Sequence, residues 1–536
     1  MKNKGYIFFL FIVCFAFVQC AKRGTPTGGE IDIDPPRFVR ANPENYSTNF
    51  RAEEIRIHFN EYIKLVKPQE QIIISPPITP RPEITPLGNP QRYVRIRIND
   101  TLQENTTYVI NFGNSVVDNN ESNPLPFFKY VFSTGSYIDS LTVSGTVNDA
   151  LLNEAEPFIS VMLYERDENF SDSLIYTQPP RYITNTLDSL RTFELTNLKP
   201  GSYQLVAIKD RNNDYKYNPG REKIAFINEP VNIPTDTTYN LTLFQEDLAF
   251  QPERPKQLNS NKLLIGYRGR IEADSVAFQA LGSAPANFDY RLVKVPAKDS
   301  IHFYFKPQLE TDTLRLRSVT SRRTDTLTTR IVNMPADTLQ VSTEPSGNLE
   351  FGANIVLRAN TPLSTVNNDL ISIMDRDSTL INFTSELRPF ENLVHLQFPK
   401  NENQSYTLNV LPGALTDFYN STNDSISRVF KTRAYSEYGN LSLNLLNVRS
   451  FPIIVQLTDE KGVVKAEQYS TSSTNFRFEY ITPGKYLLRL IYDENENAIW
   501  DTGNYLKRIP PEEIIYYPSL LDVRQNWDIN ETFNLN

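Results

Sequence analysis

Apolar and polar residues alternate along most of the chain. Three apolar side chains fall on one face of Ile55–Phe59, and the same period of two recurs in Tyr93–Ile98, His302–Phe305 and Leu314–Arg317. Runs of this kind, bounded by Pro, Asn, Asp and Gly, predict half-buried β-strands. We find no convincing amphipathic helix longer than about two or three turns. Half-buried strands are covered when sheets pack face to face, so we predict an all-β fold built of β-sandwiches.

Two sequence patterns occur twice in the chain. The residues Phe193–Tyr203, with spaced apolar positions, a Pro-Gly pair and a tyrosine, return 283 positions later as Phe476–Tyr486. The residues Glu104–Tyr108, with a Glu-Asn pair and a tyrosine, return 298 positions later as Glu402–Tyr406. Repetition at nearly constant spacing predicts two copies of a two-domain unit, with a further β segment between the copies.

Each half of the repeated unit resembles a known domain. The first half opens with Asp34-Pro35-Pro36, contains a strand ending at Phe59–Glu61 and closes with Tyr130–Thr134. It resembles the bacterial Ig-like domain of surface-layer proteins. The second half runs from Val143–Val147 through Leu198–Tyr203 to a loop rich in Asp and Asn. It resembles the prealbumin-like sandwich of carboxypeptidase regulatory domains, and both resemblances imply spacer and binding modules.

These patterns give a predicted domain order for the 536 residues, a length that calls for several cores. We expect a lipoprotein signal peptide at 1–19, a flexible tether at 20–33, a bacterial Ig-like domain at 34–136, a prealbumin-like sandwich at 137–245, a β-rich domain at 246–340, a second Ig-like domain at 341–435 and a second prealbumin-like sandwich at 436–536.

The N-terminus has the composition of an export signal. Two lysines precede the apolar run Gly5–Val18, whose 14 residues are too few for a comfortable membrane span. Cys20 follows this run and, since Cys14 lies inside it, would be the sole cysteine after cleavage. This resembles a bacterial lipoprotein signal, which implies that Cys20 carries diacylglycerol and a fatty acid such as palmitate. Gln19 stands where a small residue is usual, so an ordinary secretory signal is the alternative.

The charge and the tether bear on partners and location. The formal net charge is −9 and no Lys/Arg-rich run is present, which argues against nucleic acid as a partner. Cys20, the tether and the first domain together resemble the Ig-like lipoproteins of the Bacteroidota. This implies an outer-membrane lipoprotein facing the periplasm or the cell surface, with the surface favoured. It also suggests an accessory role in the β-barrel assembly machinery, with an outer-membrane β-barrel protein as partner.

No catalytic set is visible in the sequence. The three histidines, His58, His302 and His395, each lie within an alternating strand pattern. No Gly-x-Ser-x-Gly or His-Glu-x-x-His motif occurs. We therefore predict a non-catalytic scaffold or interaction protein. A glycan-binding or adhesive lipoprotein is the alternative, although only Trp500 and Trp527 could offer the tryptophan platform that sugars favour.

Two Asp/Asn-rich loops are the only candidates for a cofactor, which would be Ca²⁺. Their oxygen-bearing side chains fall at alternate positions, as in calcium loops. The residues are Asp210, Asn212, Asp214 and Asn218 in the first loop and Asp493, Asn495, Asn497 and Asp501 in the second. The glycine expected at the sixth position is absent from both loops. The alternative is a hairpin connection in which Asp and Asn side chains cap their own backbone.

Overall fold

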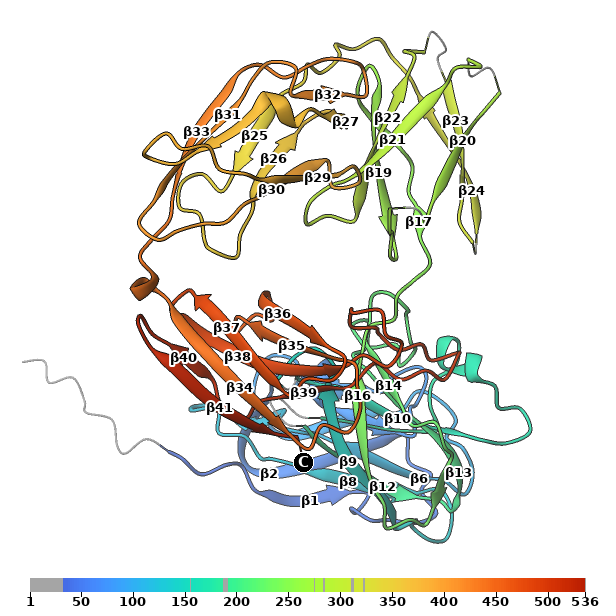
Figure 1. Cartoon of the computed structure of the whole chain (residues 1–536). Coiled ribbons are helices and arrows are strands. Elements are labelled where there is room, and N and C mark those ends of the chain that lie inside the picture. The colour runs from blue at the N-terminus through green and yellow to red at the C-terminus, as the bar shows by residue number, and fades with distance from the viewer. Residues whose placement is uncertain are drawn as a thin grey trace, which may run out of the picture. The chain divides into compact units, whose positions relative to one another are not determined.

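The computed structural model describes residues 32–154, 156–186, 191–273, 275–282, 285–309, 313–321 and 323–535. Strands dominate this part of the chain (Figure 1), which confirms the all-β prediction. Within it, no helix is both long and apolar enough to cross a membrane. The predicted signal peptide and Cys20 lie outside the described residues.

The chain divides into two compact units, one ending at Asp139 and the other starting at Ser140. In the first unit, one sheet has the order β1 (Phe38–Asn42), β2 (Glu54–Leu65), β5 (Gln91–Arg97), β4 (Glu83–Thr85), with β7 (Val116–Asp118) also paired to β2. A short helix, α2 (Pro68–Gln71), leads to the second sheet of β3 (Ile73–Ser75), β6 (Thr107–Asn111) and β8 (Lys129–Ser133). The alternating residues Ile55, Ile57 and Phe59 enter the core between these sheets.

The second unit begins with a sandwich that we call the 141–243 sandwich. One of its sheets has the order β12 (Thr192–Leu198), β9 (Leu141–Asp149), β16 (Thr238–Leu243). The other has the order β11 (Tyr182–Asn185), β10 (Ser160–Glu165), β13 (Gly201–Ile208), β14 (Ile224–Phe226), and β15 (Val231–Ile233) also pairs with β13. A 3-10 turn, η1 (Asp172–Tyr176), precedes β11. Apolar residues of both sheets form one core.

The next sandwich, called here the 251–330 sandwich, also has two sheets. The first has the order β17 (Gln251–Pro252), β19 (Lys262–Arg268), β22 (Ser300–Lys306), β21 (Asp289–Lys294), with β18 (Lys256–Asn259) also on β19. The second has the order β20 (Ala277–Leu281), β23 (Thr313–Val319), β24 (Thr324–Arg330). Their shared core contains Phe303 and Phe305, which carry the period of two seen in the sequence.

The 341–431 sandwich follows. Its sheets have the orders β25 (Val341–Glu344), β26 (Ile355–Ala359), β30 (Leu393–Gln397), β29 (Thr384–Arg388) and β28 (Ile371–Met374), β31 (Ser405–Val410), β33 (Ile426–Lys431), with a further pair of β27 (Leu363–Val366) and β32 (Leu415–Asp417). A 3-10 turn, η2 (Asn368–Leu370), precedes β28. These strands enclose a core of their own.

The last sandwich is called the 439–534 sandwich. It follows a 3-10 turn, η3 (Tyr435–Glu437). Its first sheet has the order β37 (Asn475–Ile481), β34 (Gly439–Leu446), β41 (Asp528–Asn534). Its second sheet has the order β36 (Val464–Ser470), β35 (Ile453–Thr458), β38 (Gly484–Tyr492), β39 (Ile514–Tyr516), and β40 (Leu521–Val523) also pairs with β38. Its final strand pairs parallel with β34, just as β16 pairs parallel with β9. The domain boundaries given above stay predictions.

The repeated tyrosines make the same hydrogen bonds in both copies. The hydroxyl of Tyr108 accepts from the backbone N–H of Gln103 at 2.9 Å, and that of Tyr406 accepts from Asn401 at 2.7 Å. In the other repeated half, the hydroxyl of Tyr203 donates to the Lys199 carbonyl at 3.2 Å, and Tyr486 donates to Thr482 at 2.6 Å. The sequence repetition therefore records a shared set of turn contacts.

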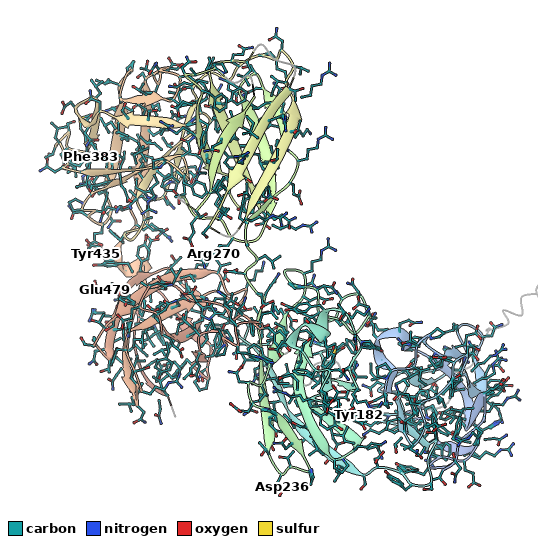
Figure 2. All side chains as sticks on the ribbon, turned by 90° about the vertical axis from the view of Figure 1, so that its right-hand side faces the viewer. Tyr182, Asp236, Arg270, Phe383, Tyr435 and Glu479 are labelled. Atoms are coloured by element: carbon teal, nitrogen blue, oxygen red, sulfur yellow. The ribbon has the colours of Figure 1, made fainter. Side chains whose placement is uncertain are left out.

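An aromatic cluster joins the last two sandwiches of the second unit. Phe351 lies 4.8 Å, between ring centroids, from both Tyr435 and Tyr480, and these two tyrosines stack at 4.9 Å. Tyr435 and Glu479, the neighbour of Tyr480, are labelled in Figure 2. Glu350 adds polar contacts, since it accepts from the Tyr438 hydroxyl and from Arg433, each at 2.5 Å.

Candidate functional site

The first Asp/Asn loop folds onto its own backbone. Asp210 accepts hydrogen bonds from the N–H groups of Asn212 at 3.0 Å and Tyr215 at 2.8 Å. Burial raises the pKa of Asp210, and the bond from Tyr215 opposes that rise. Glu222, which is buried, accepts from the N–H groups of Arg211 and Asn218, both at 2.9 Å. Two carboxylates therefore hold the loop closed.

The second loop repeats this arrangement. Asp493 accepts from the N–H of Ala498 at 2.8 Å, the counterpart of the bond from Tyr215 in the first loop. Glu512 is buried and accepts from the N–H groups of Glu494 at 2.8 Å and Asp501 at 2.9 Å. Burial raises the pKa of Glu512, against the effect of these two backbone bonds.

These bonds bear directly on the calcium hypothesis. Asp210 and Asp493 use their oxygens to accept backbone N–H groups, which is the geometry of Asx turns. In the second loop, Asn495 and Asn497 donate their amide N–H groups to Asp501, each at 2.6 Å. Across the described residues, no group of three His, Cys, Asp or Glu side chains is placed to hold a metal ion. Calcium binding by the eight loop residues stays a prediction, and the hydrogen bonds favour its alternative.

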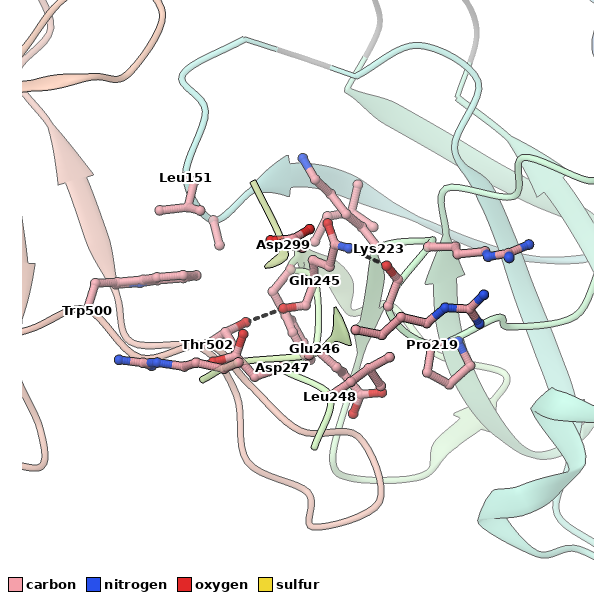
Figure 3. Close-up of a pocket in the computed structure, with 18 of the residues that line it drawn as sticks. Leu151, Pro219, Lys223, Gln245, Glu246, Asp247, Leu248, Asp299, Trp500 and Thr502 are labelled. Carbon is pink, nitrogen blue, oxygen red and sulfur yellow. Dashed lines mark hydrogen bonds and ion pairs between the residues drawn. The ribbon is translucent and has the colours of Figure 1, made fainter. Parts of the chain in front are cut away.

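Segments next to the two loops line one cavity of about 910 Å³ inside the second unit (Figure 3). Pro219–Arg221 follows the first loop, while Trp500 and Thr502 flank Asp501 of the second. Further walls come from the linker Phe244–Leu248, from Tyr267–Arg270 of the 251–330 sandwich and from Asp149–Leu151 at the end of β9. Arg270 spans these segments, since its guanidinium lies 3.4 Å from the Asp247 carboxylate and 3.7 Å from that of Asp501. The structure thus brings the repeated loops to a single junction.

A buried glutamate connects the walls of this junction. Glu246 is 7% exposed and accepts from the hydroxyl of Tyr217 at 3.0 Å and from the N–H of Tyr505 at 2.7 Å. The Thr502 hydroxyl donates to the Gln245 carbonyl at 2.7 Å, beside that glutamate (Figure 3). Burial, with the nearby Glu246 carboxylate, raises the pKa of the Tyr217 hydroxyl. Glu246 therefore binds the 141–243 sandwich to a loop that lies more than 250 positions later in the chain.

Further contacts extend the junction on both sides. Arg508 forms an ion pair with Asp172, and its guanidinium lies 4.8 Å from the ring of Tyr505. Arg489 and Tyr516 both donate to the carbonyl of Leu151. Because these donors come from the 439–534 sandwich and the acceptors from the 141–243 segment or its loops, the two repeated sandwiches are held by several separate polar contacts.

Gly503 packs closely at the same place. A Cβ added to this residue would lie 2.7 Å from the Phe244 ring and 2.7 Å from the Ile509 carbonyl oxygen, closer than real Cβ contacts come. The glycine therefore lets the second loop approach the linker.

The histidines are not brought together by the fold. His58 lies on β2, His302 on β22 and His395 on β30, in three different sheets. Burial lowers the pKa of His302 to about 4, with the nearby Lys262 contributing, and burial also lowers the pKa of His395. Within the second unit, neither His302 nor His395 is among the described residues that line the junction cavity.

Sequence reasoning missed the glutamates of the junction. Glu222 comes 12 positions after Asp210, whereas Glu512 comes 19 positions after Asp493, so a search at constant spacing does not align them. Glu246 falls next to the expected boundary between two domains, where no motif marks it. The one available signal was the acidic pair Glu246-Asp247 between the apolar residues Leu243-Phe244 and Leu248.

Comparison with known proteins supports the Ig-like assignment of the first unit. A family model described as bacterial Ig-like domain matches residues 32–134. A search of curated proteins found no match.

Solved structures with long alignments to this chain include domains 1–6 of the surface layer protein SbsC, at 9% identity, covering 91% of this chain and 67% of that one, with a TM-score of 0.16. The Escherichia coli adhesin FdeC aligns at 8% identity over 62% of this chain and 93% of its own, with a TM-score of 0.16. The human desmocollin-1 ectodomain aligns at 8% identity over 91% and 98%, with a TM-score of 0.15. Scores this low carry no argument about function.

Proposed function

We propose that this chain is a non-catalytic, lipid-anchored envelope protein that serves as an interaction scaffold at the outer membrane. The observation that carries this proposal is the Glu246 junction, which ties together sandwiches from distant parts of the chain. A binding protein made of several sandwiches gains affinity when its modules are held in a fixed arrangement, because less freedom is lost on binding. A junction in which the buried Glu246 carboxylate accepts two hydrogen bonds contributes to that rigidity.

The lipid anchor is tested by substitution of the predicted acylated residue. Wild-type protein expressed in a bacterium that processes lipoproteins should incorporate labelled palmitate, and Cys20→Ser should not. Cys14→Ser is the matched control, since it removes the other cysteine of the predicted leader and should leave labelling intact. Equal labelling of the wild type and Cys20→Ser would show that the anchor was misread.

The binding partner of the proposed scaffold can be identified by purification from outer membranes. We propose an outer-membrane β-barrel protein, in an accessory role to β-barrel assembly. Affinity purification from gently solubilised outer membranes, followed by mass spectrometry, should recover such a protein in constant proportion to this chain. A variant with a loosened junction, Glu246→Ala, should recover less of it. A chain that purifies as a solitary species under these conditions would count against the scaffold role.

A glycan-binding function is the second candidate, and Trp500 is the observation that favours it. Trp500 lines the junction cavity and donates its indole N–H to the Glu512 carbonyl at 3.0 Å, which fixes the ring in place. Fixed aromatic side chains in concave sites are common binding surfaces. Binding on a glycan array that is lost in Trp500→Ala and kept in Trp527→Ala would support this function. If no glycan on the array is bound, the glycan-binding function is ruled out and the scaffold role is the remaining candidate.

A further inference from the structure

One sheet face of the first unit gathers arginines that are scattered in the sequence. In β2, β5 and β4 the buried residues alternate with residues on the opposite face, and β1 buries Ala41 alone. The strand register places Arg40 beside His58, His58 beside Tyr93 and Arg56 beside Arg95. Because directly paired residues of antiparallel strands share a face, these side chains all lie away from the core. The same face also carries Arg97, Glu54 and Glu83, from the next row of pairs.

Two of these arginines oppose each other directly across the strands. Arg56 pairs with Arg95, and like charges at such positions destabilise a sheet. The guanidinium of Arg56 is 2.6 Å from the Glu54 carboxylate, which also raises the pKa of Arg56. Within the described residues we find no such acidic neighbour for Arg95 or Arg40. The face therefore keeps a repulsive arrangement that folding alone does not favour.

The sign of this face is opposite to that of the whole protein. Its paired positions hold four arginines and two glutamates, whereas the chain has a formal net charge of −9. On an acidic protein, a local positive patch is attracted to a negatively charged surface while the rest of the protein is repelled by it. The patch therefore orients the molecule at such a surface. We refer to these residues as the arginine face.

We propose that the arginine face docks on the phosphate-bearing headgroups of the membrane to which the protein is tethered. The choice of a membrane as occupant rests on the proposed lipid anchor at Cys20. Phe38 opens β1 eighteen positions after Cys20, and an extended segment of that length reaches about 60 Å. A span of eighteen positions is enough chain for the first unit to reach the bilayer. The complementary charge of the arginine face then fixes which side of the unit meets the lipid.

The size of the effect follows from the electrostatics of anionic bilayers. Each arginine near such a surface contributes about 1 kcal/mol, so loss of two should weaken vesicle binding about thirty-fold. The interaction is screened over about 10 Å at about 0.1 M salt and over about 3 Å at about 1 M salt. Binding should therefore be lost in high salt.

The test uses an unlipidated chain, residues 20–536 carrying Cys20→Ser, which retains all of the described residues. Its binding is measured by co-sedimentation with vesicles made of equal parts phosphatidylglycerol and phosphatidylcholine, and with vesicles of phosphatidylcholine alone. Arg56→Ser with Arg95→Ser tests the face, and Arg56→Lys with Arg95→Lys should retain binding by preserving charge. Arg315→Ser with Arg317→Ser is the matched control, because it removes two outward arginines from β23 in the second unit.

We expect the wild type and the lysine variant to bind phosphatidylglycerol vesicles, the first serine variant to lose about thirty-fold, and the control to change little. Equal binding to both vesicle types, or an equal loss in the control, would overturn the proposal. Because this chain carries no lipid, the outcome is independent of whether Cys20 is acylated, and palmitate labelling tests that separately.

Discussion

Removal of the Glu246 carboxylate should open the junction between the repeated sandwiches. In Glu246→Ala, the buried N–H of Tyr505 and the hydroxyl of Tyr217 both lose their acceptor. A hydrogen bond to a charged group contributes about 1.5–3 kcal/mol, and a buried donor left unsatisfied costs about as much. The two bonds together predict a loss of about 3–6 kcal/mol in the free energy that holds the junction closed.

Hydrogen–deuterium exchange measures this opening locally. Peptides covering 500–506 and 244–250 should exchange at least about a hundredfold faster in Glu246→Ala, since about 1.4 kcal/mol corresponds to a factor of ten. Peptides from the core of the 341–431 sandwich should be unaffected. Glu246→Gln should cost only about 1 kcal/mol, because its side chain keeps an oxygen for Tyr505 and fills the same space.

A neighbouring acid provides the control for this prediction. Asp247 is half-exposed and pairs with Arg270 at 3.4 Å. Asp247→Ala should therefore change the free energy of local opening, as measured by exchange, by less than about 1 kcal/mol. A double-mutant cycle of Glu246→Ala with Tyr217→Phe should give a coupling of about 1–2 kcal/mol. If Glu246→Ala accelerates exchange no more than Asp247→Ala does, the buried carboxylate does not hold the junction.

Three further predictions concern single loops. Asp118 accepts four backbone N–H bonds that outweigh the effect of burial and lower its pKa. Its ionised carboxylate should therefore stabilise the fold at neutral pH, and this stabilisation should be lost as the pH falls below about 4. Urea denaturation of the wild type and of Asp118→Asn over this pH range measures the difference. Gly503→Ala should lower stability by about 1–3 kcal/mol through its clash with Phe244, seen as a lower melting temperature, whereas Gly352→Ala meets open space without a positive φ and should lose less. Added Ca²⁺ should leave the melting temperature unchanged; a rise that Asp493→Ala abolishes would instead establish the calcium loops.

The sequence was a good guide to strands because burial has a direct signature in it. Ile55, Ile57 and Phe59 are all buried, as their alternation predicts. The repeated tyrosines were also informative, since Tyr108 and Tyr406 serve the same turn in both copies. Contacts of this kind depend on residues close in sequence, so a repeated pattern carries them.

Features that depend on strand register or on distant segments were not visible in the sequence. Arg56 and Arg95 are 39 positions apart and become neighbours only when β2 pairs with β5 in one register. A search for basic runs along the chain could not detect them. Glu246 and Tyr505 are 259 positions apart, and no sequence motif near either residue predicts their contact. The repulsive pair and the buried carboxylate are thus properties of the assembled sheets.

The distance along the chain between Glu246 and Tyr505 has a consequence for how the protein matures. Each sandwich is built from strands close in sequence, so a chain that folds from its N-terminus can complete the 141–243 sandwich early. The junction must then wait until the final hundred or so residues have emerged. During that interval Glu246 and Tyr217 remain exposed to water, and a prematurely terminated polypeptide would leave them permanently accessible to proteases.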